Sequence, residues 1–150
     1  SALSSGNIKV LCSGVYDENN LSNNIESSFY NIYPSDLLIN FSQNLSSIYN
    51  ANNLVETSNG NNFYFTANGG VYRTNTSMTN VNLIIPIESD VLNITTEKYA
   101  VNDTTDAYSN ILYMNDLNNI GKIYKYNINL SLIVDTLSVS GKVLDIKFKN

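Results

Sequence analysis

The alternation of apolar and polar residues is longest over residues 121–135, which read GKIYKYNINLSLIVD. Apolar side chains recur there at every second position, which is the period of a β-strand with one buried face. A strand of about 13 residues would run about 43 Å at roughly 3.3 Å per residue, so the pattern predicts a strand spanning the long axis of a small domain. The residues predicted to face inward are Tyr124, Tyr126, Ile128, Leu130, Leu132 and Val134.

The first 16 residues form an apolar segment that Gly6 and Gly14 interrupt. Because Val10 faces one way and Leu11 the other, the segment resembles a strand that is buried on both faces. The polar residues 17–24 (DENNLSNN) follow it. We therefore expect a flexibly joined strand, residues 1–16, ahead of a head domain, residues 17–150. The residues of this strand expected to be buried are Ile8, Val10, Leu11, Cys12 and Val15.

Shorter strands are predicted in the middle of the chain. The sequence NGG at residues 68–70 predicts a hairpin turn between strands at residues 62–67 and 71–77. Pro86 cannot donate a ladder hydrogen bond, so it predicts an edge or a bulge in the strand that begins at residue 81. Residues 25–50 fit an amphipathic helix as well as short strands, and both options stay open.

The C-terminal half continues the pattern. Further strands are predicted at residues 91–101 and 108–114, and the last strand, residues 142–149, points Leu144, Ile146 and Phe148 at the core. About eight strands, separated by turns every 8 to 12 residues or so, predict an all-β sandwich or barrel.

Composition limits the possible functions. The chain has 150 residues, of which 43% are apolar and only 14% charged, so one core can form beneath a surface rich in Asn, Ser and Thr. A net charge of −5 argues against a nucleic-acid partner. The chain has no histidine and one cysteine, which removes imidazole chemistry and an internal disulfide. We expect no metal, no cofactor and no enzymatic activity, because paired carboxylates are the only catalytic route left.

Two terminal features bear on location. No apolar run is long enough to span a membrane, and no segment with the pattern of a signal peptide opens the chain. The chain is therefore expected to be either cytosolic or a mature, processed protein. The start at Ser1-Ala2-Leu3 favours the processed form.

Asn-x-Ser/Thr sequons are the most frequent chemical motif, and in exported chains they accept N-linked glycans. Two pairs of acidic residues, at 17/18 and 103/106, are candidate calcium ligands, but neither fits the Asp-x-Asp-x-Asp-Gly loop. A lysine and an Asn or Asp on adjacent strands can also form an isopeptide bond when a buried carboxylic acid assists, although the sequence does not place three such groups together. Cys12 is expected to be a small core residue. The sequons begin at Asn20, Asn40, Asn44, Asn75, Asn93, Asn102 and Asn129.

In composition and in the order of its elements, the chain resembles the subunits of archaeal thread filaments, and its layout is similar to that of bacterial chaperone-usher pilins. The resemblance is carried by the apolar segment NIKVLCSGVY, the polar stretch after it, the sequons and the low charge. It implies an extracellular, immunoglobulin-like antiparallel β-sandwich that is incomplete and is completed by the N-terminal strand of the next identical subunit. The chain departs from the bacterial pilins in lacking their cysteine pair.

Strand donation has a physical basis. A sandwich that lacks one strand exposes unpaired backbone groups over an open core, and a neighbour's strand repairs both defects. Residues 7–16 would then lie in that groove, with Ile8, Val10 and Cys12 facing the core and Lys9 facing outward. The strands predicted to flank the groove are residues 124–134 and 143–148.

Two functions are expected from these observations. The first is a structural subunit of a cell-surface filament that polymerises head to tail with identical subunits. The alternative is a monomeric extracellular binding module, lectin-like or anchoring to a surface layer. The alternative is favoured if residues 7–16 are the first strand of their own domain.

Overall fold

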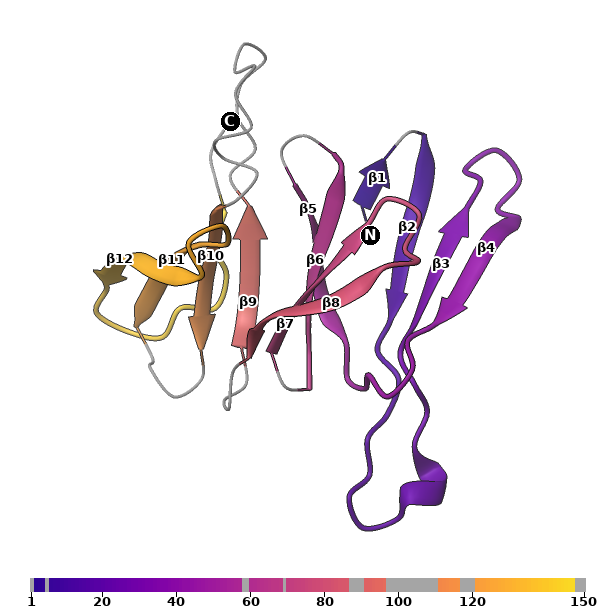
Figure 1. Cartoon of the computed structure of the whole chain (residues 1–150), viewed down its shortest axis with the longest axis horizontal. Coiled ribbons are helices and arrows are strands. Elements are labelled where there is room, and N and C mark those ends of the chain that lie inside the picture. The colour runs from indigo at the N-terminus through magenta and orange to yellow at the C-terminus, as the bar shows by residue number, and fades with distance from the viewer. Residues whose placement is uncertain are drawn as a thin grey trace.

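The computed structural model describes residues 2–4, 6–57, 60–68, 70–86, 91–96, 111–116 and 121–147. These residues form three four-stranded antiparallel sheets and one 3-10 turn, η1 (Leu21–Asn23) (Figure 1). The all-β, antiparallel prediction is confirmed. No α-helix occurs in the described ranges, so residues 25–50 take the strand option that the sequence left open.

Each sheet is a meander, in which strands that are neighbours in sequence are also neighbours in space. The first sheet contains β1 (Ala2–Ser4), β2 (Asn7–Cys12), β3 (Ser28–Ile32) and β4 (Ile39–Asn44). The middle sheet contains β5 (Asn52–Glu56), β6 (Asn62–Ala67), β7 (Gly70–Asn75) and β8 (Val81–Pro86). The third sheet contains β9 (Val91–Thr96), β10 (Ile111–Asp116), β11 (Lys122–Asn127) and β12 (Leu132–Ser138).

The first strands of the three sheets adjoin one another. β5 contacts both β1 and β9, and in Figure 1 the first sheet lies to the right of the middle sheet and the third sheet to its left. Hydrophobic clusters fill the space between the middle sheet and each of the other two, as in the layers of a sandwich.

The middle sheet separates two hydrophobic clusters. On one face, Phe65 meets Phe29 of the first sheet edge to face at 5.2 Å and stacks on Tyr72 at 5.4 Å. On the other face, Tyr64 packs with Leu112 and other residues of the third sheet. Because β6 is covered on both sides, four consecutive residues, 63–66, are buried.

The prediction of one long strand over residues 121–135 is wrong. The chain turns there, so that β11 and β12 form a hairpin. The Asn127 side chain accepts a hydrogen bond from the Leu130 backbone N–H at 3.1 Å, and Ser131 takes a left-handed conformation with φ 53°. Apolar and polar residues alternate in the strands on both sides of a hairpin turn, so the alternation alone does not reveal where the turn lies. Of the residues predicted to face inward, Tyr126 is buried and Tyr124 and Ile128 are partly buried, whereas Leu130, Leu132 and Val134 are exposed.

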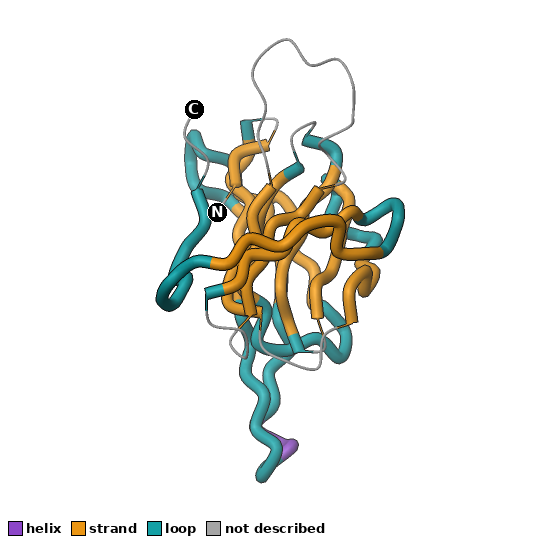
Figure 2. The backbone as a smooth tube through the Cα atoms, turned by 90° about the vertical axis from the view of Figure 1, so that its left-hand side faces the viewer, coloured by secondary structure: helices purple, strands orange, loops and turns teal. Residues whose placement is uncertain are grey.

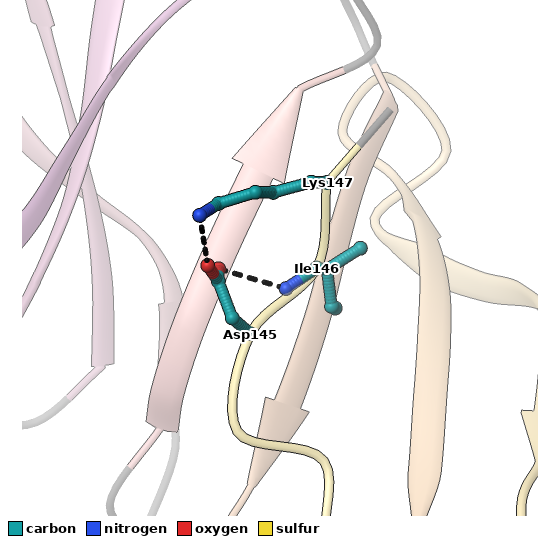
Figure 3. Close-up of polar contacts among 3 residues, drawn as sticks. All are labelled: Asp145, Ile146 and Lys147. Atoms are coloured by element: carbon teal, nitrogen blue, oxygen red, sulfur yellow. Dashed lines mark hydrogen bonds and ion pairs between the residues drawn. The ribbon is translucent and has the colours of Figure 1, made fainter. Parts of the chain in front are cut away.

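The predicted C-terminal strand is also wrong over residues 142–147, which belong to no β-strand. Val143 is buried, and its carbonyl accepts a hydrogen bond of 2.8 Å from the Asn115 side chain on β10. Beside β10 the chain continues through Asp145, whose carboxylate accepts the Ile146 N–H at 2.8 Å and pairs with Lys147 at 2.9 Å (Figure 3). The Lys147 contact is the main reason that the pKa of Asp145 is lowered. Leu144 is exposed, Ile146 is half-buried, and Phe148 lies outside the described residues.

Two local predictions are confirmed. β6 and β7 form the hairpin expected on either side of residues 68–70, with Gly70 at φ 143°. β8 ends at Pro86 and lies at the edge of the middle sheet, where a residue without an N–H is tolerated.

Gly14 is expected to tolerate no side chain. Its φ is +69°, and an added Cβ would lie 2.6 Å from the Ser27 backbone nitrogen and closer still to the Ile25 carbonyl. Gly6 offers a matched control, because its φ is +81° but nothing lies within 4 Å of an added Cβ. Gly6→Ala should lower the free energy of unfolding by about 1 to 2 kcal/mol through backbone strain alone. Gly14→Ala should cost about 1 to 3 kcal/mol more through the steric clash.

Denaturant unfolding of both variants measures this difference. Equal losses in Gly14→Ala and Gly6→Ala would contradict the close approach of residues 14 and 25–27.

Candidate binding surface

The strand predicted to be donated pairs within its own sheet. β2 pairs with β3 from Ile8 to Cys12 and with β1 from Asn7 to Lys9, so the strand lies within a sheet of its own chain. Donation of residues 7–16 to a neighbour is therefore not what the structure shows. The expected boundary between residues 16 and 17 falls inside a connection between β2 and β3.

Side chains of β2 alternate between two faces as predicted. The face that turns inward carries Lys9 and Leu11, however, and not Ile8, Val10 and Cys12. Lys9 is only 5% exposed, and its ammonium donates to the Thr76 carbonyl at 3.3 Å. Leu11 joins the cluster around Phe29. Val10 is half-buried on the other face, and Cys12 is an exposed free thiol rather than a core residue.

The outer face of the first sheet has no further layer over it among the described residues, and it combines apolar side chains with polar ones such as Ser42 and Asn44. Ile8, Val10 and Ile32 are half-buried there, and Ile39 is 59% exposed. By contrast, the outer face of the third sheet carries the extended segment that holds Val143.

A cleft of about 390 Å³ lies between β2 and the start of β5. β1 pairs only with Asn7 to Lys9, so the edge of β2 beyond Lys9 faces this cleft. Among the described residues, no charged side chain lines it. The lining residues are Val10, Leu11, Ser13, Ala51, Asn52, Asn53 and Leu54.

Hydrogen bonds fix the walls of the cleft. The Ser13 carbonyl accepts the Ala51 N–H at 2.9 Å and also the Ser27 hydroxyl. Asn53, in a left-handed conformation with φ 55°, donates its side-chain amide to the Thr66 hydroxyl at 3.1 Å. The cleft is therefore largely preformed.

Residues 13–27, which we call the arm, project from the base of the first sheet (Figures 1 and 2). The polar stretch at residues 17–24 forms the hydrogen-bonded tip of the arm. Val15 and Ile25 exchange backbone hydrogen bonds of 2.8 and 3.0 Å. At the tip, the Asp17 carboxylate accepts from Asn23 at 3.1 Å, and from the N–H groups of residues 19 and 20. These bonds, that from Asn23 first, lower the pKa of Asp17.

The arm carries apolar side chains into solvent. Val15, Leu21 and Ile25 are 47%, 68% and 61% exposed. Tyr16 is 45% exposed, and its ring lies 5.4 Å from that of Tyr49 at the base of the arm. Ser13 and Ala51 line the cleft. Tyr16 follows Ser13 and Tyr49 precedes Ala51, so each tyrosine is only a few residues along the chain from the cleft.

Sequence reasoning missed the arm and the cleft for different reasons. The spacing of Asp17 and Asn20 ahead of Leu21 was a signal for a capped turn, since short polar side chains bond to nearby backbone N–H groups. The cleft joins residues from β2 and β5, which the sequence does not show to be neighbours.

The sequons differ in accessibility. Asn40, Asn44 and Asn129 are exposed, whereas Asn75 is half-buried and its side-chain amide donates to the Thr79 hydroxyl at 3.4 Å. Asn20 is exposed and caps η1 by accepting from Ser22. The side chain of Asn93 and the whole of Asn102 lie outside the described residues.

In the described part of the chain, no cluster of three or more His, Cys, Asp or Glu side chains is present, and no helix is long and apolar enough to cross a membrane. The pair 17/18 is a poor calcium site because amide groups already occupy the Asp17 oxygens. The pair 103/106 lies outside the described residues.

Comparisons with known proteins give no family. No family model matches the sequence, and no curated protein matches it. One solved structure that the comparison matched is the β-propeller domain of Cps50 (Swd1) from Myceliophteria thermophila, at 8% sequence identity and a TM-score of 0.44. The match covers 91% of this chain and 60% of that chain, so this chain spans less than two thirds of the length of the domain it matches.

Glycan occupancy should follow the accessibility of the sequons. If the protein is exported through a glycosylation pathway, Asn40, Asn44 and Asn129 should carry glycans, because their side chains are exposed. Asn75 should stay unmodified, since its amide nitrogen is engaged by Thr79. Glycopeptide mass spectrometry of the native protein measures this. Occupied Asn75 together with bare Asn40 and Asn129 would contradict the expectation.

Proposed function

We propose that this chain is a non-catalytic, extracellular recognition module that binds a glycan at the cleft between β2 and β5. The observation that carries this proposal is the cleft itself, whose lining is uncharged and whose walls are held by hydrogen bonds. Its volume of about 390 Å³ lies within the roughly 300 to 1,000 Å³ typical of ligand pockets.

The chemistry of the lining favours a neutral, hydroxyl-rich ligand. Side-chain amides such as that of Asn52 both donate and accept hydrogen bonds, as sugar hydroxyls require. Val10 and Leu54 supply apolar contact for the C–H face of a sugar ring. A charged ligand would find no counter-charge in this lining and would lose hydration without compensation.

The arm extends the surface beyond the cleft. Tyr16 and Tyr49 present aromatic bodies with polar hydroxyls at its base, which suits a partner that has both apolar and hydroxyl groups. The exported location of the module rests on the sequons and the low charge. The pairing of β2 within a sheet of its own chain favours this module over strand donation.

Tyr16→Ala should weaken glycan binding about 5- to 10-fold, equivalent to about 1 to 1.4 kcal/mol, the range expected for one aromatic contact. Tyr33→Ala is the matched control, because Tyr33 is 42% exposed, close to the 45% of Tyr16, but lies at the turn after β3. Glycan-array screening followed by calorimetric titration measures both. Failure to bind any neutral glycan, or equal losses in the two variants, would sink the proposal.

A second candidate is a self-assembling surface subunit, and the open outer face of the first sheet favours it. The occupant would be a second copy, because the described outer-face side chains, including Ile8, Val10 and Ile39, are uncharged and so avoid repulsion between chains of net charge −5. An incomplete, pilin-like sandwich completed by its neighbour belongs to this candidate.

The small area of this outer face makes the self-assembling subunit the second candidate. Three strands of about six residues cover only roughly 300 Å², at about 4.8 Å per strand and 3.3 Å per residue. A stable interface buries about 800 Å² per partner. The exposed Leu21 and Ile25 of the arm would have to supply the remainder.

Association through this face should depend on Ile39. Sedimentation velocity and electron microscopy of the wild type should show oligomers or fibres, and Ile39→Ser should reduce them. Leu83→Ser, at an exposed apolar position on the middle sheet, should leave them unchanged. A wild type that stays monomeric at high concentration would remove this candidate.

A further inference from the structure

A lysine and an asparagine are enclosed together between the first and middle sheets. Lys9 on β2 and Asn31 on β3 are direct cross-strand partners, so their side chains share one face of the sheet. That face turns inward, since Lys9 is 5% and Asn31 is 9% exposed. Directly opposite residues place their Cβ atoms about 4.5 to 5.5 Å apart, within reach of a lysine's four-carbon stem.

The polar groups in this enclosure are poorly satisfied. The Asn31 side-chain oxygen is buried without a hydrogen-bond partner in the described part of the chain, and so is the hydroxyl of Thr74 on β7. The Lys9 ammonium has one long hydrogen bond, to the Thr76 carbonyl at 3.3 Å. Buried groups of this kind are rare in folded proteins and each asks for an explanation.

We propose that Lys9 and Asn31 react to form an intramolecular isopeptide bond, with Glu56 as the carboxyl group that transfers protons. Glu56 ends β5, which lies against both β1 and β2. Burial lowers the pKa of Lys9, and the negative charge of Glu56 partly raises it.

The reaction needs no oxidant and no cofactor. The neutral Lys9 amine attacks the Asn31 side-chain carbonyl carbon, forming a new C–N bond. Glu56 accepts a proton from the attacking nitrogen and gives one to the Asn31 amide nitrogen, which leaves as ammonia. The product is a secondary amide, and the chain becomes lighter by one ammonia molecule. The lowered pKa of Lys9 raises the fraction of amine that can attack.

The bond would close the chain at the root of the arm. β2 and β3 are the two strands that continue into residues 13–27, so a covalent link between Lys9 and Asn31 would hold the ends of the arm together. A load applied to the arm would then not separate these strands. Cross-linking also restricts the unfolded chain, as a disulfide does.

Intact-mass spectrometry of the full chain, measured after denaturation, tests the proposal. The folded wild type should be lighter than its sequence by one ammonia. Lys9→Met and Asn31→Ala should show their full sequence masses, and Glu56→Gln should slow or abolish the mass loss while keeping both reacting residues. Lys147→Met, at a lysine whose side chain is 84% exposed, should retain the loss.

Peptide mapping separates the bond from other losses of ammonia. Trypsin should fail to cut after Lys9 and should release a branched peptide that joins the segments around residues 9 and 31. A folded wild type, verified by its β-type circular dichroism, that shows the full sequence mass would overturn the proposal and leave a buried water as the partner of Asn31. A mass loss that persists in Lys9→Met would overturn it as well, since cyclisation of an asparagine on its own backbone also releases ammonia.

Discussion

The contact between Phe29 and Phe65 is the one on which the arrangement of the first two sheets depends. The rings meet edge to face at 5.2 Å, and both side chains are fully buried. Burial of Phe29 fixes which face of β3 turns inward. Because Lys9 and Leu11 lie on that same face by register, the orientation of β2 is fixed with it. The enclosed lysine, the half-exposed outer face and the position of the arm all follow.

The opposite orientation of β2 would be better for β2 alone. It would bury Ile8 and Val10, at about 1.5 to 3 kcal/mol each, and would release Lys9 to solvent. A paired sheet does not turn over strand by strand, however, because a shift of one residue moves every side chain of a strand to the other face. An aromatic side chain buries about 150 to 250 Å², and Phe29 packs within a cluster that also holds Phe63 and Phe65. The cluster therefore outweighs the preference of β2.

Sequence patterns predicted what depends on local chemistry. The turn at residues 68–70 and the edge position of Pro86 follow from backbone sterics that a few residues decide, and both were found. The all-β class followed from spacing. The choice of inward face for β2 could not be predicted, because its partner β3 was not known to carry Phe29 opposite Leu11. The hairpin of β11 and β12 was missed because Asn127 and Ser131 close a turn without glycine or proline.

The strands β2 and β3 both continue into the arm, and β2 also contributes one wall of the cleft. There the Ser13 carbonyl ties the arm to Ala51 on the other wall. A ligand that contacts Tyr16 would pull on this hairpin, whose remaining anchors are ladder hydrogen bonds and the packing of Phe29. Each ladder bond contributes only about 0.5 to 1.5 kcal/mol net, so the hairpin can open one pair at a time under load. A covalent link between Lys9 and Asn31 would resist the separation of β2 and β3 under that force. The proposed bond would therefore stabilise the same hairpin that carries the proposed binding surface.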